Sequence, residues 1–323
     1  MSIGTNNDFV IYQDEMSTGM TEVLTQYAED VQAGTNGAIQ MVTQFTLGDF
    51  EKRSFFKMTE NLINERDPNS TANLPSTSLA QAELVGVKIH RSIHNQNTLD
   101  AFRKIGSDAS LMSFVLGRQV GSAVALDYLN TGLVALTAAI ESLGGDAVLD
   151  VADGTTPVTV DASLLNQVRA KLGDRALSRL RAWVMSSKSY FDLVGSQIAD
   201  KVTGSHDVVI YGGTPATLNL PVYVTDSEAL MDTDAGEYKI LGLVEGALTL
   251  NQSEDDAVVS ELVGGLANIV ARFQFEYAYN VSVKGFAYAG VKNPSKSVLG
   301  NSASWDYALD SVKDGAGVLL VTN

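Results

Sequence analysis

Residues 107–143 read SDASLMSFVLGRQVGSAVALDYLNTGLVALTAAIESL and carry the clearest structural signal in the chain. Large aliphatic residues recur there at steps of three and four, the spacing of one helix face: Leu126, Leu129, Leu133, Leu136, Ile140 and Leu143. Ser107 and Asp108 are residues that cap a helix start, and the glycine pair 144–145 follows as a stop. The pattern predicts one continuous helix of about 55 Å at 1.5 Å per residue.

This predicted helix is too apolar to lie on a surface. Between residues 109 and 143 only Arg118, Asp127 and Glu141 are charged, whereas a solvent-facing helix carries a broad polar face. Its glycines lower the intrinsic helix propensity, so its stability must come from packing. We therefore expect protein to cover most of its circumference.

The residues before the helix divide into two parts. Residues 1–48 are polar apart from one amphipathic stretch at 20–31, which predicts an arm with a single helix that must pack on another surface. Residues 49–95 contain two strand-like pieces, 48–59 and 84–93, separated by the polar excursion NERDPNSTANLPSTS. So long a connection is unusual inside a compact domain, and we expect it to reach outside the subunit.

The residues after the helix alternate helices and strands. We expect helices at 162–172 and 188–198, a strand at 180–185, strand-like runs within 207–250 and a closing strand at 317–321. Residues 268–290 alternate apolar and polar side chains and predict one long, half-buried strand. Its apolar face carries Ile269, Ala271, Phe273, Phe275, Tyr277 and Tyr279.

Two stretches of opposite charge stand out in this second half. The basic stretch, residues 169–201, contains Arg169, Lys171, Arg175, Arg179, Arg181, Lys188 and Lys201. The acidic stretch, residues 226–261, has Lys239 as its one base and contains Asp226, Glu228, Asp232, Asp234, Glu237, Glu245, Glu254, Asp255, Asp256 and Glu261. Stretches of opposite charge such as these can attract each other across a contact between protein surfaces.

Composition excludes several classes of protein. The 323 residues are 45% hydrophobic, enough for a sizeable core, and the net charge of −16 argues against a tight grip on phosphate backbones. The chain has no cysteine, which excludes disulfides and thiol catalysis. The first residues, MSIGTNNDFVIYQDEM, lack the pattern of a signal peptide, and no apolar run approaches a membrane span, so we expect synthesis in a cytoplasm and no membrane partner.

Side chains that could carry chemistry are few. His90 and His94 would share a helix face, but they fall in a predicted strand, where four residues span about 13 Å, too far for one metal ion. His206 stands alone in a turn. The aromatic strand at 273–279 has only Arg272 and Lys284 as flanking bases, too few for a nucleic-acid stacking platform, so we interpret it as a core or interface face.

The remaining candidates also favour structural interpretations. GGTPAT at 212–217 lacks the lysine of a phosphate loop. The pair Asp232/Asp234 and the run 254–256 lack calcium-loop spacing and are interpreted as a solvated acidic face. Ser186, Ser187 and Lys188 are adjacent, without the one-turn spacing of a Ser–Lys nucleophile pair. We therefore predict no catalytic, cofactor-binding or metal-binding residues, and no cofactor.

Three segments of the second half resemble a known family. They are RAWVMSSKSYFDLVGSQ at 181–197, GGTPATLNLPVYVTDS at 212–227 and NPSKSVLGNSASWDYALDSVKDGAGVLLVTN at 293–323. Together with the order of the predicted elements, they resemble the major capsid proteins of tailed bacteriophages with the Hong Kong 97-type fold. No scaffolding-like region precedes the predicted arm, which leaves open a separate scaffolding protein or a cleaved precursor.

The resemblance implies an α+β fold with named parts. These are an N-terminal arm (1–48), an extended loop or E-loop (49–95), a peripheral domain with the spine helix at about 107–143 (96–185), an axial domain (186–267), a long peripheral-domain strand (268–290) and a C-terminal segment (291–323). Lys52, Lys57 and Lys88 lie near the loop, but no motif assigns any of them to a covalent cross-link.

The resemblance also implies a function without catalysis. Such a protein is made in the host bacterial cytoplasm and resides in the virion, where it self-assembles into pentamers and hexamers of an icosahedral head enclosing double-stranded DNA. Its partners are copies of itself, with scaffolding, portal and decoration proteins also expected. Three alternatives stay open: an encapsulin-like compartment shell, an acidic surface-layer or binding protein, and a hydrolase that uses Asp232, Asp234 and Asp255.

Overall fold

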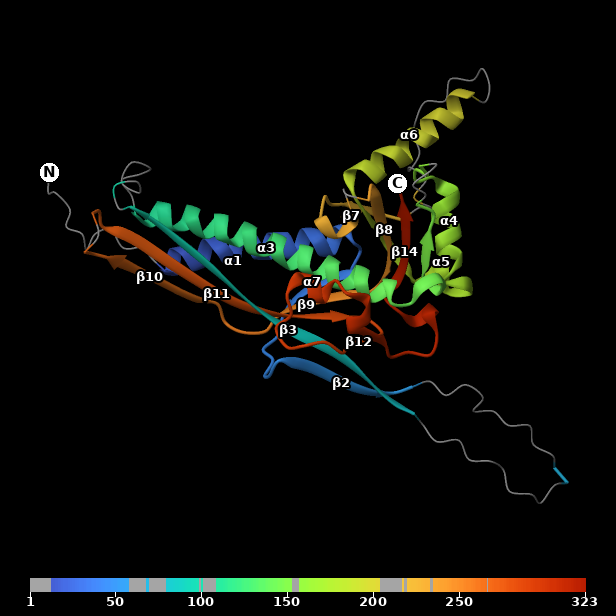
Figure 1. Ribbon diagram of the computed structural model, residues 1–323, viewed down its shortest axis with the longest axis horizontal. Helices are drawn as coiled ribbons and strands as arrows, with labels where there is room; N and C mark the ends of the chain where they lie inside the picture. The colour runs from blue at the N-terminus through green and yellow to red at the C-terminus, as the bar shows by residue number, and fades with distance from the viewer. Residues whose placement is uncertain are drawn as a thin grey trace.

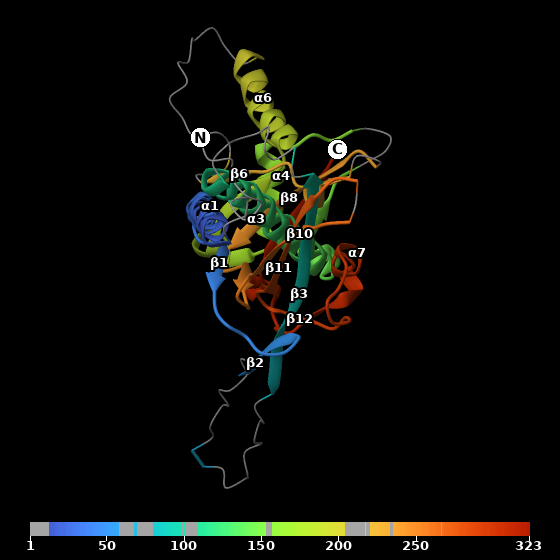
Figure 2. The same cartoon turned by 90° about the vertical axis from the view of Figure 1, so that its left-hand side faces the viewer.

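A computed structural model describes residues 13–57, 68–69, 80–98, 100, 109–152, 157–203, 217, 220–232, 235–265 and 267–323. The subunit is elongated and contains two β-sheets, with a pair of long helices along the larger one (Figure 1). Helix α6 projects from the upper side of the molecule and strand β2 lies on the lower side in both views (Figures 1 and 2). The mixed helix and sheet content confirms the predicted α+β class.

The larger sheet is built around two very long strands. Its path is β1–β9–β11–β3–β12–β13, with β10 added on β11 and β2 added on β3. The strands are β1 (Ile39–Thr43), β2 (Phe50–Phe56), β3 (Gln81–Thr98), β9 (Leu248–Gln252), β10 (Ala257–Val263), β11 (Val270–Val283), β12 (Phe286–Tyr288) and β13 (Trp305–Tyr307).

Strand β3 joins two regions of this sheet. Its first half pairs antiparallel with β2, from Phe56↔Gln81 to Phe50↔Val87. Its second half pairs antiparallel with β11, from Val281↔Val87 to Val270↔Thr98. The two strands predicted on either side of the polar excursion are therefore confirmed, and β3 is longer than expected, while residues 64–67 and 70–78 of the excursion lie outside the described residues.

The predicted spine helix is confirmed as α3 (Ala109–Glu141). It ends where expected, because Gly144 adopts a positive φ of 54°. The predicted capping residues 107 and 108 lie outside the described residues. The second half of the helix is almost wholly buried, and residues such as Leu133, Leu136 and Ile140 are inaccessible to solvent.

Helix α1 (Gln13–Gly34) lies along α3 and forms a helical layer with it (Figures 1 and 2). By length and composition, α3 is also the one helix among the described residues that is apolar enough to cross a membrane, over Ser113–Glu141. However, 72% of that window is buried inside the subunit, as expected for the core helix that its sequence predicts.

The smaller sheet follows the order β4–β14–β8–β5–β6, with β7 paired to β8. Its strands are β4 (Val148–Asp150), β5 (Leu180–Met185), β6 (Val222–Val224), β7 (Met231–Asp232), β8 (Glu237–Val244) and β14 (Gly317–Thr322). The helices α4 (Ala162–Ala170), α5 (Ala176–Arg179) and α6 (Ser187–Thr203) belong to this region, and α7 (Lys296–Leu299) contacts α3. The predicted strands 180–185 and 317–321 are confirmed, as are both predicted helices.

One predicted strand is wrong as drawn, because residues 268–290 form two strands. Strand β11 ends at Val283, and the chain turns at Gly285, which has a positive φ of 84°. Strand β12 then pairs with β13 and, at Ala287, with β3. The alternation of buried and less buried side chains continues after the turn, since Phe286 and Tyr288 are buried as well.

The division of the strands between the two sheets does not coincide with the predicted domain boundaries at residues 185 and 267. Strand β5, which precedes the first boundary, lies in the smaller sheet between β8 and β6. Strands β9 and β10, which were expected in the axial domain, lie in the larger sheet beside β11. Nonlocal pairing of this kind leaves no local signal in the sequence.

Candidate assembly surfaces

Helices α1 and α3 approach each other at three glycines. A Cβ atom on Gly117 would lie 2.1 Å from the carbonyl oxygen of Met16, and one on Gly121 would lie 2.9 Å from that of Met20. From the other side, a Cβ on Gly19 would lie 2.6 Å from the carbonyl oxygen of Phe114. Glycine is therefore required for this backbone-to-backbone contact. The helix of the predicted arm must pack on another surface, and that surface is the spine helix of its own chain.

A buried lysine fixes the segment that joins β1 to β2. Lys88 on β3 has a side chain only 3% exposed, and its ammonium donates to the carbonyl oxygen of Thr46 and to Glu254, both at 2.8 Å. The pKa of Glu254 is lowered, first by this hydrogen bond. Nearby, Asn280 donates to the Thr46 hydroxyl at 2.7 Å. The segment is thereby held at both its backbone and its side chains.

Asp127 connects the spine helix to the larger sheet. Its carboxylate accepts hydrogen bonds from the hydroxyls of Tyr277 and Tyr279, at 3.1 and 3.0 Å. Burial raises the pKa of both tyrosines, and the Asp127 charge raises it further. Phe275 and both tyrosines are buried against the helical layer. The aromatic strand is therefore core, as we interpreted it from the sequence.

Part of the charge pairing expected between subunits occurs within one chain. Arg181 of the basic stretch donates to Glu245 of the acidic stretch at 2.7 Å. Arg179 of the basic stretch pairs with Asp314, which lies outside the acidic stretch. At the start of α6, the backbone N–H of Ser187 donates to Asp226 at 2.8 Å and lowers the pKa of that carboxyl. The side chains of residues 175 and 201 lie outside those that the structure describes.

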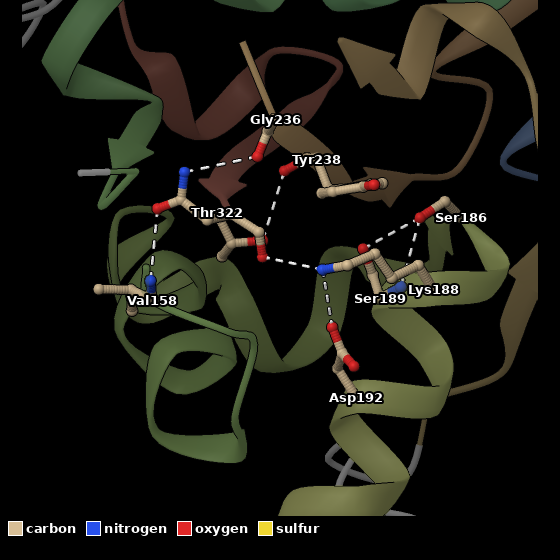
Figure 3. Close-up of polar contacts among 9 residues, drawn as sticks. Val158, Ser186, Lys188, Ser189, Asp192, Gly236, Tyr238 and Thr322 are labelled. Carbon is tan, nitrogen blue, oxygen red and sulfur yellow. Dashed lines mark hydrogen bonds and ion pairs between the residues drawn. The ribbon is translucent and has the colours of Figure 1, made fainter. Parts of the chain in front are cut away.

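The first turn of α6 is tied to the last residues of the chain (Figure 3). The Lys188 ammonium donates to Asp192 at 3.0 Å and to the carbonyl oxygen of Asn323 at 3.1 Å, and it lies 4.2 Å from the Tyr238 ring centre. The Ser186 hydroxyl instead shares a hydrogen bond with Ser189. Ser186 and Lys188 therefore have different hydrogen-bond partners. The contacts of Lys188 join the start of α6 to the end of the chain and to Tyr238, which is a structural role.

The other candidate chemical groups are not brought together. His90 and His94 lie on strand β3, as predicted. Among the described residues no three His, Cys, Asp or Glu side chains are placed to hold a metal ion. Asp232 ends β7 and accepts from the Ala235 N–H at 3.0 Å, whereas residues 206 and 234 lie outside the described residues.

The whole chain can now be compared with known proteins. The model of the Gp13-like family, described as "Major capsid protein 13-like", matches residues 8–319. This chain belongs to that family of major capsid proteins. Among curated proteins, no sequence matches it significantly.

Solved structures show the same fold at low sequence identity. The capsid structure of Cyanophage Pam1 is 12% identical with a TM-score of 0.54, and 88% of each chain is covered. The capsid of Ralstonia phage GP4 is 11% identical with a TM-score of 0.53, covering 89% of this chain and 87% of that one. A structure from Mycobacterium phage Adephagia is 10% identical with a TM-score of 0.54, covering 90% and 89%.

The family assignment confirms the main functional prediction. This coat protein is a structural component of a bacteriophage head, and its place is the capsid of the virion. Its Hong Kong 97-like α+β fold confirms the predicted fold class. The match does not favour the encapsulin-like or surface-layer alternatives. Sequence reasoning did not find the roles of Gly117, Gly121 and Lys88, since each depends on a contact distant in sequence.

Proposed function

We propose that this coat protein assembles into pentamers and hexamers, which close into an icosahedral head around double-stranded DNA. The observation that carries the proposal is the β2–β3 hairpin. It lies on the far side of the larger sheet from α1 and α3 (Figures 1 and 2), β2 is largely exposed, and the Lys57 N–H donates to the Ala80 carbonyl oxygen at 2.8 Å just beyond the paired strands. A strand pair that extends past its own core is suited to lie on a neighbouring copy.

The two sheets suggest how the subunit divides into domains. We place the peripheral domain on the larger sheet with α3, and the axial domain on the smaller sheet with α6. The predicted ranges 96–185 and 186–267 then exchange strands: β5 joins the axial domain, and β9 and β10 join the peripheral domain. The arm contributes α1 to the helical layer.

The proposed head encloses DNA without binding it tightly. Helix α1 contains no basic residue and exposes the carboxylates of Asp14, Glu22, Glu29 and Asp30. An acidic face of this kind repels phosphate backbones and leaves packaged DNA mobile. We place this face toward the interior of the head.

The proposed role is mechanical and not catalytic. The separate hydrogen-bond partners of Ser186 and Lys188 support this interpretation. We further propose scaffolding and portal proteins as partners of this coat protein, with decoration proteins as an optional addition to the head.

Electron microscopy tests the proposal. The protein is produced in a bacterium, and purified particles are imaged first in negative stain and then by cryo-electron microscopy. We expect closed shells with pentameric and hexameric capsomers. A protein that stays monomeric in every assembly condition, or that forms only flat sheets, contradicts the proposal.

A further inference from the structure

A short segment between β1 and β2 displays large apolar side chains to solvent. Phe45 is 67% exposed and Leu47 is 83% exposed, and Val42 at the end of β1 is 42% exposed. We refer to Val42, Phe45 and Leu47 as the apolar knob. Clustered exposed apolar side chains of this kind typically mark an interaction site.

The backbone of the knob is held in place. The N–H of Gln44 donates to the carbonyl oxygen of Gln252 and to Asn251 Oδ1, at 3.1 and 2.7 Å, and the N–H of Thr46 donates to the carbonyl oxygen of Ser253 at 3.2 Å. The carbonyl oxygen of Thr46 in turn accepts a hydrogen bond from the Lys88 ammonium. The apolar side chains are thus presented by an ordered backbone, which lowers the entropic cost of docking.

The same chain carries a groove of suitable size and character. It has a volume of about 680 Å³ and lies between β2, β5 and the turns at residues 244–246 and 284–285. Half-buried Phe55, Leu84 and Leu309 contribute to its apolar lining. A groove of this volume accommodates side chains of the size of phenylalanine and leucine.

The charges around the groove sum to one positive charge. Arg179, Arg181 and Lys284 line it, and two of them are already paired, Arg179 with Asp314 and Arg181 with Glu245. The pKa of Lys284 is lowered, first by burial and then by the nearby charge of Arg179. The groove therefore has an excess of positive charge that a carboxylate brought by a partner would offset.

The charges around the knob are mainly negative. The exposed Asp49 lies two residues after the knob, and Glu254 and the exposed Asp255 lie beside the Lys88 contact that holds the knob segment. Lys88 itself is buried and already paired. The knob is thus apolar with an acidic edge, whereas the groove is apolar with a basic edge.

We propose that the apolar knob of one subunit inserts into the groove of a neighbouring copy of the same chain. Knob and groove are formed by different residues, so the contact can repeat head-to-tail around a capsomer, and head-to-tail contacts whose rotation closes form a ring. The inference rests on the proposed function, in which copies of this chain surround one another. It adds the residues that join adjacent subunits within a capsomer.

A double substitution tests the knob. Phe45→Ser with Leu47→Ser changes side chains that are exposed in the free subunit, so circular dichroism and urea unfolding of the unassembled protein should match the parent protein. We expect the fraction of protein in shells to fall by more than about tenfold, because a truncated aromatic anchor has a large effect at an interface. Shell formation at the parent level, under conditions where the parent forms shells, overturns the inference alone. Failure of the parent itself to form shells overturns the proposed function.

Cysteine cross-linking tests the pairing of knob with groove. The chain contains no cysteine, so subunits carrying Leu47→Cys can be mixed with subunits carrying Leu309→Cys, assembled and treated with a short bis-maleimide. We expect covalent dimers in this mixture and none when the second partner carries Val291→Cys, whose parent side chain is 63% exposed elsewhere on the surface. Assembled shells without Leu47–Leu309 dimers, or with equal dimers in the control, overturn the inference.

Discussion

Replacing Gly117 with alanine tests the contact between the two long helices. The new Cβ would lie 2.1 Å from the Met16 carbonyl oxygen and 2.8 Å from its carbonyl carbon. Ordinary contacts between carbon and oxygen are about 3.3 Å or longer. Because both obstructing atoms belong to the backbone of α1, no side-chain rotation relieves the clash, and the helices must separate by about 1 Å.

Two opposing terms set the size of the effect. Alanine is the better helix former by about 1 kcal/mol, whereas overpacking a well-packed contact costs about 1–3 kcal/mol. The expected result is a loss of roughly 0–2 kcal/mol in the free energy of unfolding. Detachment of α1 is not expected, because Met16, Met20 and Val31 are buried and contribute about 1.5–3 kcal/mol each.

Urea unfolding of the unassembled subunit, followed by circular dichroism, measures this effect. The matched control is Gly195→Ala in helix α6, where an added Cβ meets nothing within 4 Å. There the propensity term acts alone, so the control should be stabilised by up to about 1 kcal/mol. Gly121→Ala, with 2.9 Å to Met20, should fall between the two. Equal stabilisation by Gly117→Ala and Gly195→Ala would refute the close-contact reasoning.

Three further predictions concern buried polar groups. Lys88→Met should lower the free energy of unfolding by about 1–3 kcal/mol, because the Thr46 carbonyl oxygen loses its donor. The control is Lys52→Met, whose parent side chain is 62% exposed, and it should lower that free energy by less than about 1 kcal/mol. Similar losses in both variants would contradict this reasoning. Asp127→Asn should lower the free energy of unfolding by about 1–3 kcal/mol, since two tyrosine hydroxyls lose a charged acceptor, and an unchanged urea midpoint would argue against that connection. Burial raises the pKa of Asp256 to about 6, so its ionised form destabilises the fold above pH 6 and this penalty disappears as the pH falls toward 4. Asp256→Asn should therefore stabilise the subunit at pH 8 but not at pH 4, in contrast to Asp255→Asn at the exposed neighbouring position; a pH-independent effect would be inconsistent with the buried carboxyl.

The sequence predicts the elements whose cause is local. Helix α3 was expected within two residues of its observed ends, since an uninterrupted apolar period is followed by a glycine stop. Strand β5 (Leu180–Met185) was predicted with its observed bounds, because the short run LRAWVM is mainly apolar and contains the strand-favouring residues Trp183 and Val184. These patterns suffice to indicate the fold class.

Features that depend on distant contacts could not be predicted. Gly117 and Gly121 weaken helix propensity when viewed alone, and their requirement becomes visible only beside the backbone of α1. The turn at Gly285 interrupts an alternation that continues on both sides, so periodicity gives no sign of it. Phe45 and Leu47 alternate with polar residues as a half-buried strand would, yet both point to solvent.

Strand β3 has a mechanical consequence for the assembled head. Because it continues from its pairing with β2 into its pairing with β11, tension applied at Lys57 and Ala80 acts along β3 and shears it against β11. In shear the ladder from Val87 to Thr98 is loaded as a whole and does not open one bond at a time. In the proposed DNA-filled head, pressure that pulls neighbouring subunits apart would thus be resisted by the longest ladder among the described strands.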